Sequence, residues 1–253
     1  MKRDDFLFRA GTANFILFLV ALALTFVDDR TILGIDPWIK PAKFFVSIAI
    51  YLWTLALLMP LVERRGAVRF VPMTITVVMI GEMVGIVTQS IRGVPSHFNV
   101  RTGVDSMVFS LMGMLILINT IAVLVLLAAF FRAHRVADRA LLWAIRLGLF
   151  VFTLGGLEAV FMLVRGSHTV GAPDGGPGLP LVNWSTQHGD LRIAHFLGLH
   201  ALQLLPLAAL VLARWGWPER RRVAAVFVFA IVYFGVVAAL VAYAMAKRPL
   251  ISL

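Results

Sequence analysis

Long runs of apolar residues alternate with short polar connections along the whole chain. Seven of these runs are close to the length of about 20 residues that an α-helix needs to cross the hydrocarbon core of a bilayer. The sequence therefore predicts an all-α protein with seven transmembrane helices, forming one membrane domain over residues 1–253. The expected spans are 6–27, 43–62, 71–92, 106–131, 140–165, 193–214 and 224–246.

The amino-acid composition agrees with a membrane protein. The chain is 60% hydrophobic and 14% charged, whereas soluble domains are about 25% charged. The longest connection, 166–192, has no room for a separate soluble domain. With no cysteine, the chain cannot form disulfides or thiolate metal sites. The first span is expected to be retained, because Asp4 and Asp5 interrupt the basic segment that precedes a cleaved signal.

The basic residues are distributed unequally between the two ends of the predicted spans. Fourteen lie on the side of the N-terminus and nine on the other. The positive-inside rule then predicts a cytoplasmic N-terminus, an outer C-terminus and an outer 166–192 segment, in a bacterial inner membrane. The net charge of +10 accordingly indicates membrane topology and no nucleic-acid partner. The cytoplasmic set is Lys2, Arg3, Arg9, Arg64, Arg65, Arg69, Arg132, Arg135, Arg139, Arg146, Arg214, Arg220, Arg221 and Arg222.

The sixth span carries an unusual concentration of polar side chains. Four of them fall within an arc of about 140° on a helix of 3.6 residues per turn. Hydrocarbon disfavours such groups unless they face a cavity or a partner. The sequence therefore predicts a functional site along this face, which comprises Arg192, His195, His200 and Gln203.

Carboxylates inside two other spans extend this predicted site. Glu82 lies near the middle of the third span and Glu158 lies in the fifth, and a carboxylate at such depth must be paired, protonated or functional. Together with the histidines they predict a polar cavity that opens outward between the second, third, fifth and sixth spans. Asn119, in the fourth span, is instead expected to form an interhelical hydrogen bond.

A similar arrangement of residues occurs twice, which predicts a duplicated helical hairpin. The first copy comprises spans three and four, and the second comprises spans five and six. In each copy a Glu is followed by Arg-Gly, then by Asn-x-x-Thr, and then by an Asp that lies eight residues before a Gly. The two aspartates are Asp105 and Asp190.

The intramembrane residues define the chemistry to be tested. His195, His200 and Glu82 are the predicted catalytic groups, with a histidine as general base. The candidate metal is zinc or iron, and its candidate ligands are His195, His200, Glu82 and Glu158. The two histidines are five residues apart and about 140° apart around the helix, so a third ligand is needed. Haem is disfavoured because only one span carries histidines, and retinal because the last span lacks a central lysine.

The predicted function is binding of a small-molecule or lipid-derived ligand in an outward-opening pocket. A metal-assisted membrane enzyme is one protein of this kind. An ion- or proton-coupled transporter or channel is the alternative, and a non-catalytic subunit or sensor is the third. The lipid bilayer and the ligand are the expected partners, and the oligomeric state is left open. The expected ligand-binding residues are Lys43, Gln89, Arg92, His97, Asn99, Glu158, Trp184, Asp190, Arg192 and Gln203.

Overall fold

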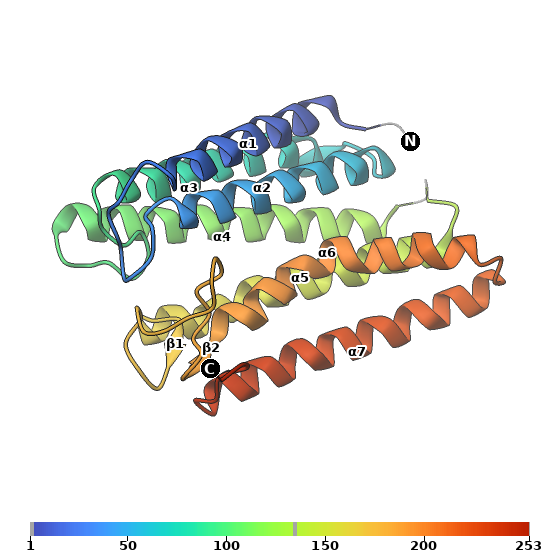
Figure 1. Ribbon diagram of the computed structural model, residues 1–253. Helices are drawn as coiled ribbons and strands as arrows, with labels where there is room; N and C mark the ends of the chain where they lie inside the picture. Colours follow the sequence, from blue (N-terminus) through green and yellow to red (C-terminus); the bar gives the residue numbers. More distant parts are fainter. Residues whose placement is uncertain (1–2, 134–135, 253) are drawn as a thin grey trace. The chain divides into compact units, whose positions relative to one another are not determined.

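The computed structural model describes residues 3–133 and 136–252. Within these residues, seven helices are long and apolar enough to cross a membrane, which confirms the predicted all-helical membrane architecture. They are α1 (Asp5–Leu24), α2 (Ile39–Leu58), α3 (Val71–Ile91), α4 (Gly103–Phe131), α5 (Arg139–Arg165), α6 (Leu191–Arg214) and α7 (Glu219–Met245), shown in Figure 1. Two short 3-10 helices, Met59–Leu61 and Gly66–Phe70, lie between α2 and α3.

Most of the helices begin earlier than their hydrophobic runs, and α2 and α7 do so by the largest margins. The helix α2 begins at Ile39 rather than at residue 43. Pro41 lies in its first turn, where the missing N–H of proline costs no helical hydrogen bond. The helix α7 begins at Glu219 rather than at residue 224. Charged residues continue a helix into the interfacial region, so hydrophobicity alone places these two boundaries too late.

Aspartates cap the N-termini of three helices. Asp4 accepts a hydrogen bond from the Leu7 N–H at 2.9 Å, and Asp138 and Asp190 act in the same way at the starts of α5 and α6. Asp138 also binds the Arg222 guanidinium. Burial raises the pKa of Asp138, but the hydrogen bond from Arg222 and the backbone donors outweigh burial, so its pKa lies below the usual value. The acid that precedes each helix is therefore structural.

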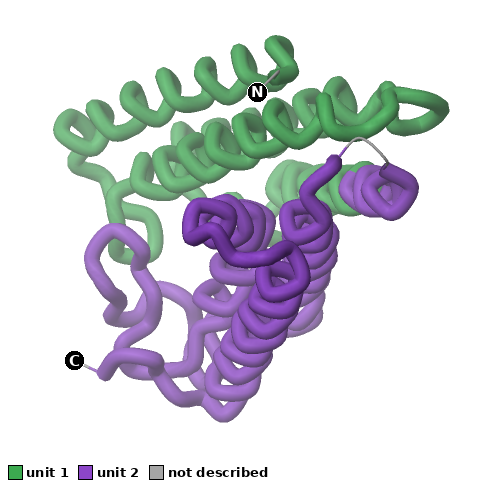
Figure 2. Tube along the Cα trace, turned by 90° about the vertical axis from the view of Figure 1, so that its right-hand side faces the viewer, with its two compact units in different colours: residues 1–122 green, residues 123–253 purple. Residues whose placement is uncertain are grey.

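The chain divides into two compact units, residues 1–122 and 123–253 (Figure 2). In unit 1, α1 and α2 pack together, and Leu7, Leu52 and Leu55 are completely buried. The Tyr51 hydroxyl donates to Asn119 Oδ1 at 3.1 Å and joins α2 to α4, which confirms the interhelical role predicted for Asn119. Unit 1 is therefore held by apolar packing and by a buried polar bond.

In unit 2, α5 and α6 run antiparallel and cross with their backbones in close approach. A Cβ atom on Gly155 would lie only 2.6 Å from the Gly198 Cα. The helix α7 packs on both, and its Tyr233 hydroxyl donates to the Leu197 carbonyl at 2.5 Å. Small residues permit this approach, and dispersion contacts between membrane helices increase as their backbones come closer.

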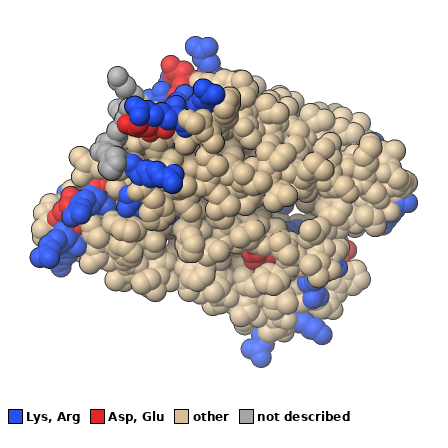
Figure 3. All heavy atoms as spheres, turned by 180° about the vertical axis from the view of Figure 1, so that it is seen from behind, with Lys and Arg blue, Asp and Glu red and all other residues tan. Residues whose placement is uncertain are grey.

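The outward faces of the helices are apolar. Large side chains such as Ile80, Leu117, Phe161 and Ile231 are exposed. Figure 3 shows lysines and arginines gathered in patches, with broad areas of other residues between them. An exposed apolar surface of this kind suits contact with lipid chains, in which the helix backbones satisfy their own hydrogen bonds.

Candidate functional site

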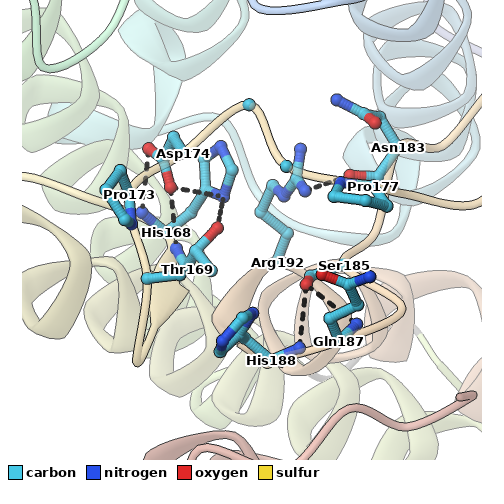
Figure 4. A pocket seen from close by; sticks show the side chains of 13 residues that line it. His168, Thr169, Pro173, Asp174, Pro177, Asn183, Ser185, Gln187, His188 and Arg192 are labelled. Carbon is cyan, nitrogen blue, oxygen red and sulfur yellow. Dashed lines mark hydrogen bonds and ion pairs between the residues drawn. The ribbon is translucent and has the colours of Figure 1, made fainter.

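The connection between α5 and α6 folds on itself and encloses a cavity of about 350 Å³. Two short strands, β1 (Thr169–Val170) and β2 (Gly189–Asp190), pair antiparallel and join the ends of the connection. Cavities of this size hold small-molecule ligands in other proteins. The polar residues that line it are His168, Thr169, Asp174, Asn183, Ser185, Gln187, His188 and Arg192 (Figure 4).

Backbone conformation gives the connection its shape. Gly171 and Gly175 have φ angles of 111° and 99°, which residues other than glycine rarely adopt. Asn183 has a φ of 53°, in the left-handed region that asparagine tolerates. A Cβ on Gly189 would lie 2.0 Å from the Ala244 carbonyl oxygen, so β2 rests directly on the end of α7. The cavity wall is therefore fixed by backbone contacts.

Asp174 organises one wall of the cavity. Its Oδ1 accepts from Ser167 Oγ at 2.7 Å and from the Thr169 N–H at 2.9 Å, and it lies 3.1 Å from His168 Nδ1. Burial raises the pKa of Asp174, but the neighbouring His168 and these donors outweigh burial, so its pKa lies below the usual value. The carboxylate is thus committed to its own loop and orients the His168 ring (Figure 4).

Arg192 and Asp190 form a second wall at the start of α6. Arg192 Nε donates to Asp190 Oδ1 at 2.9 Å, and Nη2 donates to Oδ2 at 2.6 Å and to the Asn183 carbonyl. Asp190 also accepts from the N–H groups of Arg192 and Ser185, and its side chain has no exposed surface. The structure therefore brings these two predicted residues together, with Arg192 lining the cavity and Asp190 behind it.

The 184–188 turn completes the cavity. Ser185 Oγ accepts from the N–H groups of His188 at 3.0 Å and Gln187 at 3.4 Å. Trp184, a predicted ligand-binding residue, does not line the cavity and packs its ring against Phe196 at 5.8 Å. It therefore supports the turn from outside the cavity.

Deeper in unit 2, His195 and Glu158 form a pair between α6 and α5. His195 Nδ1 lies 2.8 Å from the Gly155 carbonyl oxygen and 3.5 Å from Glu158 Oε2. A carbonyl oxygen only accepts, so Nδ1 must carry the proton. Glu158 is 6% exposed, and neither of its oxygens receives a hydrogen bond from any residue described. The structure thus joins these two predicted site residues in one pair, in which Glu158 is buried without hydrogen bonds and His195 is partly exposed.

His200 and Gln203 form a second polar group on α6. The Gln203 side chain hydrogen-bonds to the His200 imidazole. The His200 ring packs edge-on to Phe196, with ring centroids 4.2 Å apart. Neither residue lines the loop cavity. The polar face predicted for α6 is therefore divided among three separate sets of contacts, made by Arg192, His195 and His200.

In unit 1, a hydrogen-bonded cluster joins the end of α3 to the start of α4. Arg92 Nη1 lies 2.6 Å from Asp105 Oδ1, and Gln89 Nε2 donates to the same oxygen at 3.0 Å. Thr102 donates to the other carboxylate oxygen at 2.7 Å. Glu82 lies elsewhere on α3, is 2% exposed, and has one oxygen without a hydrogen-bond partner among the described residues.

The remaining predicted residues of unit 1 lie in or near the 92–101 connection. His97 Nδ1 lies 3.2 Å from Lys40 Nζ and 3.1 Å from Ser96 Oγ. The Asn99 side chain donates to the Pro95 carbonyl and stabilises its own turn. Lys43 is half-buried on α2. The functional roles of all these residues stay predictions.

A metal centre receives no support from the geometry. Protein zinc sites use three or four ligands, and no group of three or more His, Asp or Glu residues suited to a metal occurs in residues 3–133 or 136–252. His195 and Glu158 provide two groups only. We therefore assign no metal to the predicted set.

Sequence reasoning missed most of the cavity wall. Of its polar residues, only Arg192 belongs to the predicted site, whereas His168, Asp174, Ser185 and His188 do not. The available signal was the connection itself, since long loops inside compact membrane proteins are commonly binding loops. Its glycines and two histidines indicate a folded segment, but their spacing does not show which side chains converge.

Comparison of the sequence with protein-family models and with curated proteins, and of the structure with solved structures, gives no match. The interpretation of the site therefore depends on the contacts within this chain. Two features stand out in unit 2, namely the loop cavity around Arg192 and the pair formed by His195 and the buried Glu158.

Proposed function

We propose that this chain is an integral membrane protein that binds a small polar or lipid-derived molecule in the loop cavity of unit 2. The supporting observation is the cavity of about 350 Å³ between α5 and α6, lined by a guanidinium, two imidazoles, two hydroxyls, two amides and one carboxylate. Convergent polar groups around a concave space are typical of a ligand site. The catalytic roles of His195, His200 and Glu82 stay predictions.

The cavity is proposed to face outward from a bacterial inner membrane. In unit 1, Asp4 binds Arg64 and places the basic 64–69 segment beside the N-terminus. In unit 2, Asp138 binds Arg222, so two further basic segments share one end, and the 166–192 connection lies at the other end of α5 and α6. The positive-inside rule assigns both basic ends to the cytoplasm.

Cysteine labelling tests this topology cleanly, because the chain has no cysteine of its own. Gly176→Cys and Arg69→Cys each place one thiol at an exposed position. In intact cells, a membrane-impermeant maleimide is expected to label position 176, and to label position 69 only after the membrane is permeabilised. Labelling of both positions from the same side would contradict the proposed orientation.

A paired blocking experiment tests ligand binding. Gly176 lines the cavity and Gly103 begins α4, and a Cβ at either position meets no atom within 4 Å. Detergent-purified protein is incubated with a defined mixture of carboxylates, phosphates, amino acids, sugars and nucleosides, and retained compounds are identified by mass spectrometry. We expect wild type and Gly103→Trp to retain at least one compound that Gly176→Trp loses, because an indole fills much of this cavity.

Two outcomes of this experiment would contradict the binding function. One is equal retention by Gly176→Trp and wild type, and the other is the absence of any retained compound. The thermal unfolding midpoint of each variant is measured in parallel, because loss of binding counts only where the midpoint matches that of Gly103→Trp.

The pair formed by His195 and the buried Glu158 supports a second candidate, an ion- or proton-coupled transporter. A carboxylate with no hydrogen bond among the described residues, beside an imidazole, is the type of group that binds and releases protons in transporters. Reconstituted vesicles that accumulate a compound only with an imposed proton gradient, and lose this accumulation in Glu158→Gln, would favour transport over binding alone.

The helical hairpins are proposed to derive from a duplication. In both, an aspartate at the start of the returning helix binds an arginine. The pairs are Arg92 with Asp105 and Arg192 with Asp190. The arginines occupy different places, before the connection in the first hairpin and after it in the second, so the shared feature is the position of the aspartate.

A further inference from the structure

One donor in the cavity wall has no partner among the described residues. Arg192 uses Nε and Nη2 for Asp190 and the Asn183 carbonyl, whereas its Nη1 makes no hydrogen bond to any described residue. A guanidinium only donates, so the two N–H bonds of Nη1 require an acceptor. The acceptor must come from water or from a ligand.

The two carboxylates near the cavity do not supply that acceptor. Asp174 receives Ser167 Oγ and the Thr169 N–H, and it lies beside His168 Nδ1. Asp190 receives Arg192 Nε and Nη2 and two backbone N–H groups, and it is fully covered. Asp190 is therefore covered by the protein, and the donors around Asp174, which lines the cavity, offset part of its repulsion of an incoming negative charge.

Other donors complete the arrangement. Ser185 Oγ already accepts two N–H groups, so its hydroxyl proton is left to donate. The His188 imidazole lines the cavity and forms no side-chain hydrogen bond within residues 3–133 and 136–252. Figure 4 shows Arg192 and Asn183 on one side of the cavity and His168 and Asp174 on the other.

We propose that the cavity binds an oxyanion, a phosphate or carboxylate group, with Arg192 Nη1, His188 and the Ser185 hydroxyl as its donors. This inference rests on the proposed binding function and specifies its ligand class. Arginine suits this role because its planar donors match the oxygens of phosphate and carboxylate. The anionic group belongs either to a soluble compound or to a lipid headgroup, since the cavity lies beside the end of a membrane span.

Equilibrium dialysis with radiolabelled inorganic phosphate tests the proposal. Wild-type protein in neutral detergent is expected to bind one phosphate per chain. His188→Leu removes the imidazole donor, which makes no side-chain hydrogen bond to any described residue, and it is expected to weaken binding about tenfold, the effect of one hydrogen bond to a charged group. Trp215→Leu is the control, because it removes an exposed ring donor at the opposite end of α6, outside the cavity, and is expected to leave binding unchanged.

Arg192→Lys provides a second measurement. Lysine keeps a positive charge for Asp190 but lacks the planar pair of donors. Phosphate binding is expected to fall at least about tenfold, while the thermal unfolding midpoint stays near that of wild type. A variant that binds phosphate as wild type does would overturn the assignment of Nη1. Unfolding of this variant leaves His188→Leu to decide the proposal.

Lipid composition separates the two sources of the anion. Phosphate binding is measured in nanodiscs of zwitterionic lipid and in nanodiscs that contain phosphatidic acid. Competition by phosphatidic acid supports a lipid headgroup as the ligand, and unchanged phosphate binding supports a soluble oxyanion. Failure of wild type to bind phosphate in detergent and in both nanodiscs would overturn the oxyanion assignment. If the compound mixture nevertheless yields a ligand sensitive to Gly176→Trp, the binding function survives.

Discussion

Valine at position 155 is expected to destabilise the protein strongly, whereas valine at position 156 is expected to be tolerated. A Cβ on Gly155 would lie 2.6 Å from the Gly198 Cα, 2.7 Å from its carbonyl carbon and 3.0 Å from the Leu199 nitrogen. All three are backbone atoms, so no side-chain rotation relieves the clash. A Cβ on Gly156 meets no atom within 4 Å.

The expected cost at position 155 is at least about 1–3 kcal/mol, the range for overpacking in a well-packed interior. Gly156→Val instead places an apolar side chain in open space on a helix and is expected to lie within about 0.5 kcal/mol of wild type. Reversible unfolding in mixed micelles measures both free energies of unfolding. Equal effects at the two positions would show that α5 and α6 do not approach through Gly155 and Gly198.

The membrane spans were predictable because their signal is long. About 20 apolar residues in a row have few alternative explanations, and the described residues form seven helices long and apolar enough to cross a membrane. The errors occur at the ends, where Ile39 and Glu219 begin helices that hydrophobicity alone starts later. Interfacial residues are polar whether or not they are helical, so the apolar pattern does not locate those termini.

The pairing of His195 with Glu158 was only partly predictable. Burial cost favours bringing polar groups of a membrane together, and the structure joins these two. The sequence could not indicate that His200 pairs with Gln203 instead, because that choice depends on the rotation of α6 against α5. The rotation follows from contact between Gly155 and Gly198, which no helical wheel of one span reveals.

The loop cavity was not predictable from residue spacing. Its shape depends on backbone angles at single positions, including left-handed φ at Leu181 and Asn183. Leucine rarely adopts this conformation, so the sequence carried no turn signal at position 181. His168 and His188 converge on one space although twenty residues separate them, and the pairing of β1 with β2 helps to bring them together.

Leucine in place of His195 is expected to destabilise the protein by about 1–3 kcal/mol, the range for leaving a buried polar group without a partner. The substitution would leave Glu158, which is 6% exposed, without the imidazole beside it and with no hydrogen-bond donor among the described residues. Glu158→Leu is expected to cost less, because His195 would still donate to the Gly155 carbonyl at 2.8 Å. The free energy of unfolding in mixed micelles measures both effects.

The double variant His195→Leu/Glu158→Leu decides whether the two residues act as a pair. With both polar groups gone, no buried carboxylate remains at this position, and the double variant is expected to be more stable than His195→Leu alone by at least about 1 kcal/mol. His200→Leu with Glu158→Leu is the matched control, because His200 hydrogen-bonds to Gln203 and its substitution should add to that of Glu158 without coupling. Additive effects of His195 and Glu158 would contradict the pair. Such a result would show that groups other than the imidazole 3.5 Å away stabilise the buried Glu158 side chain.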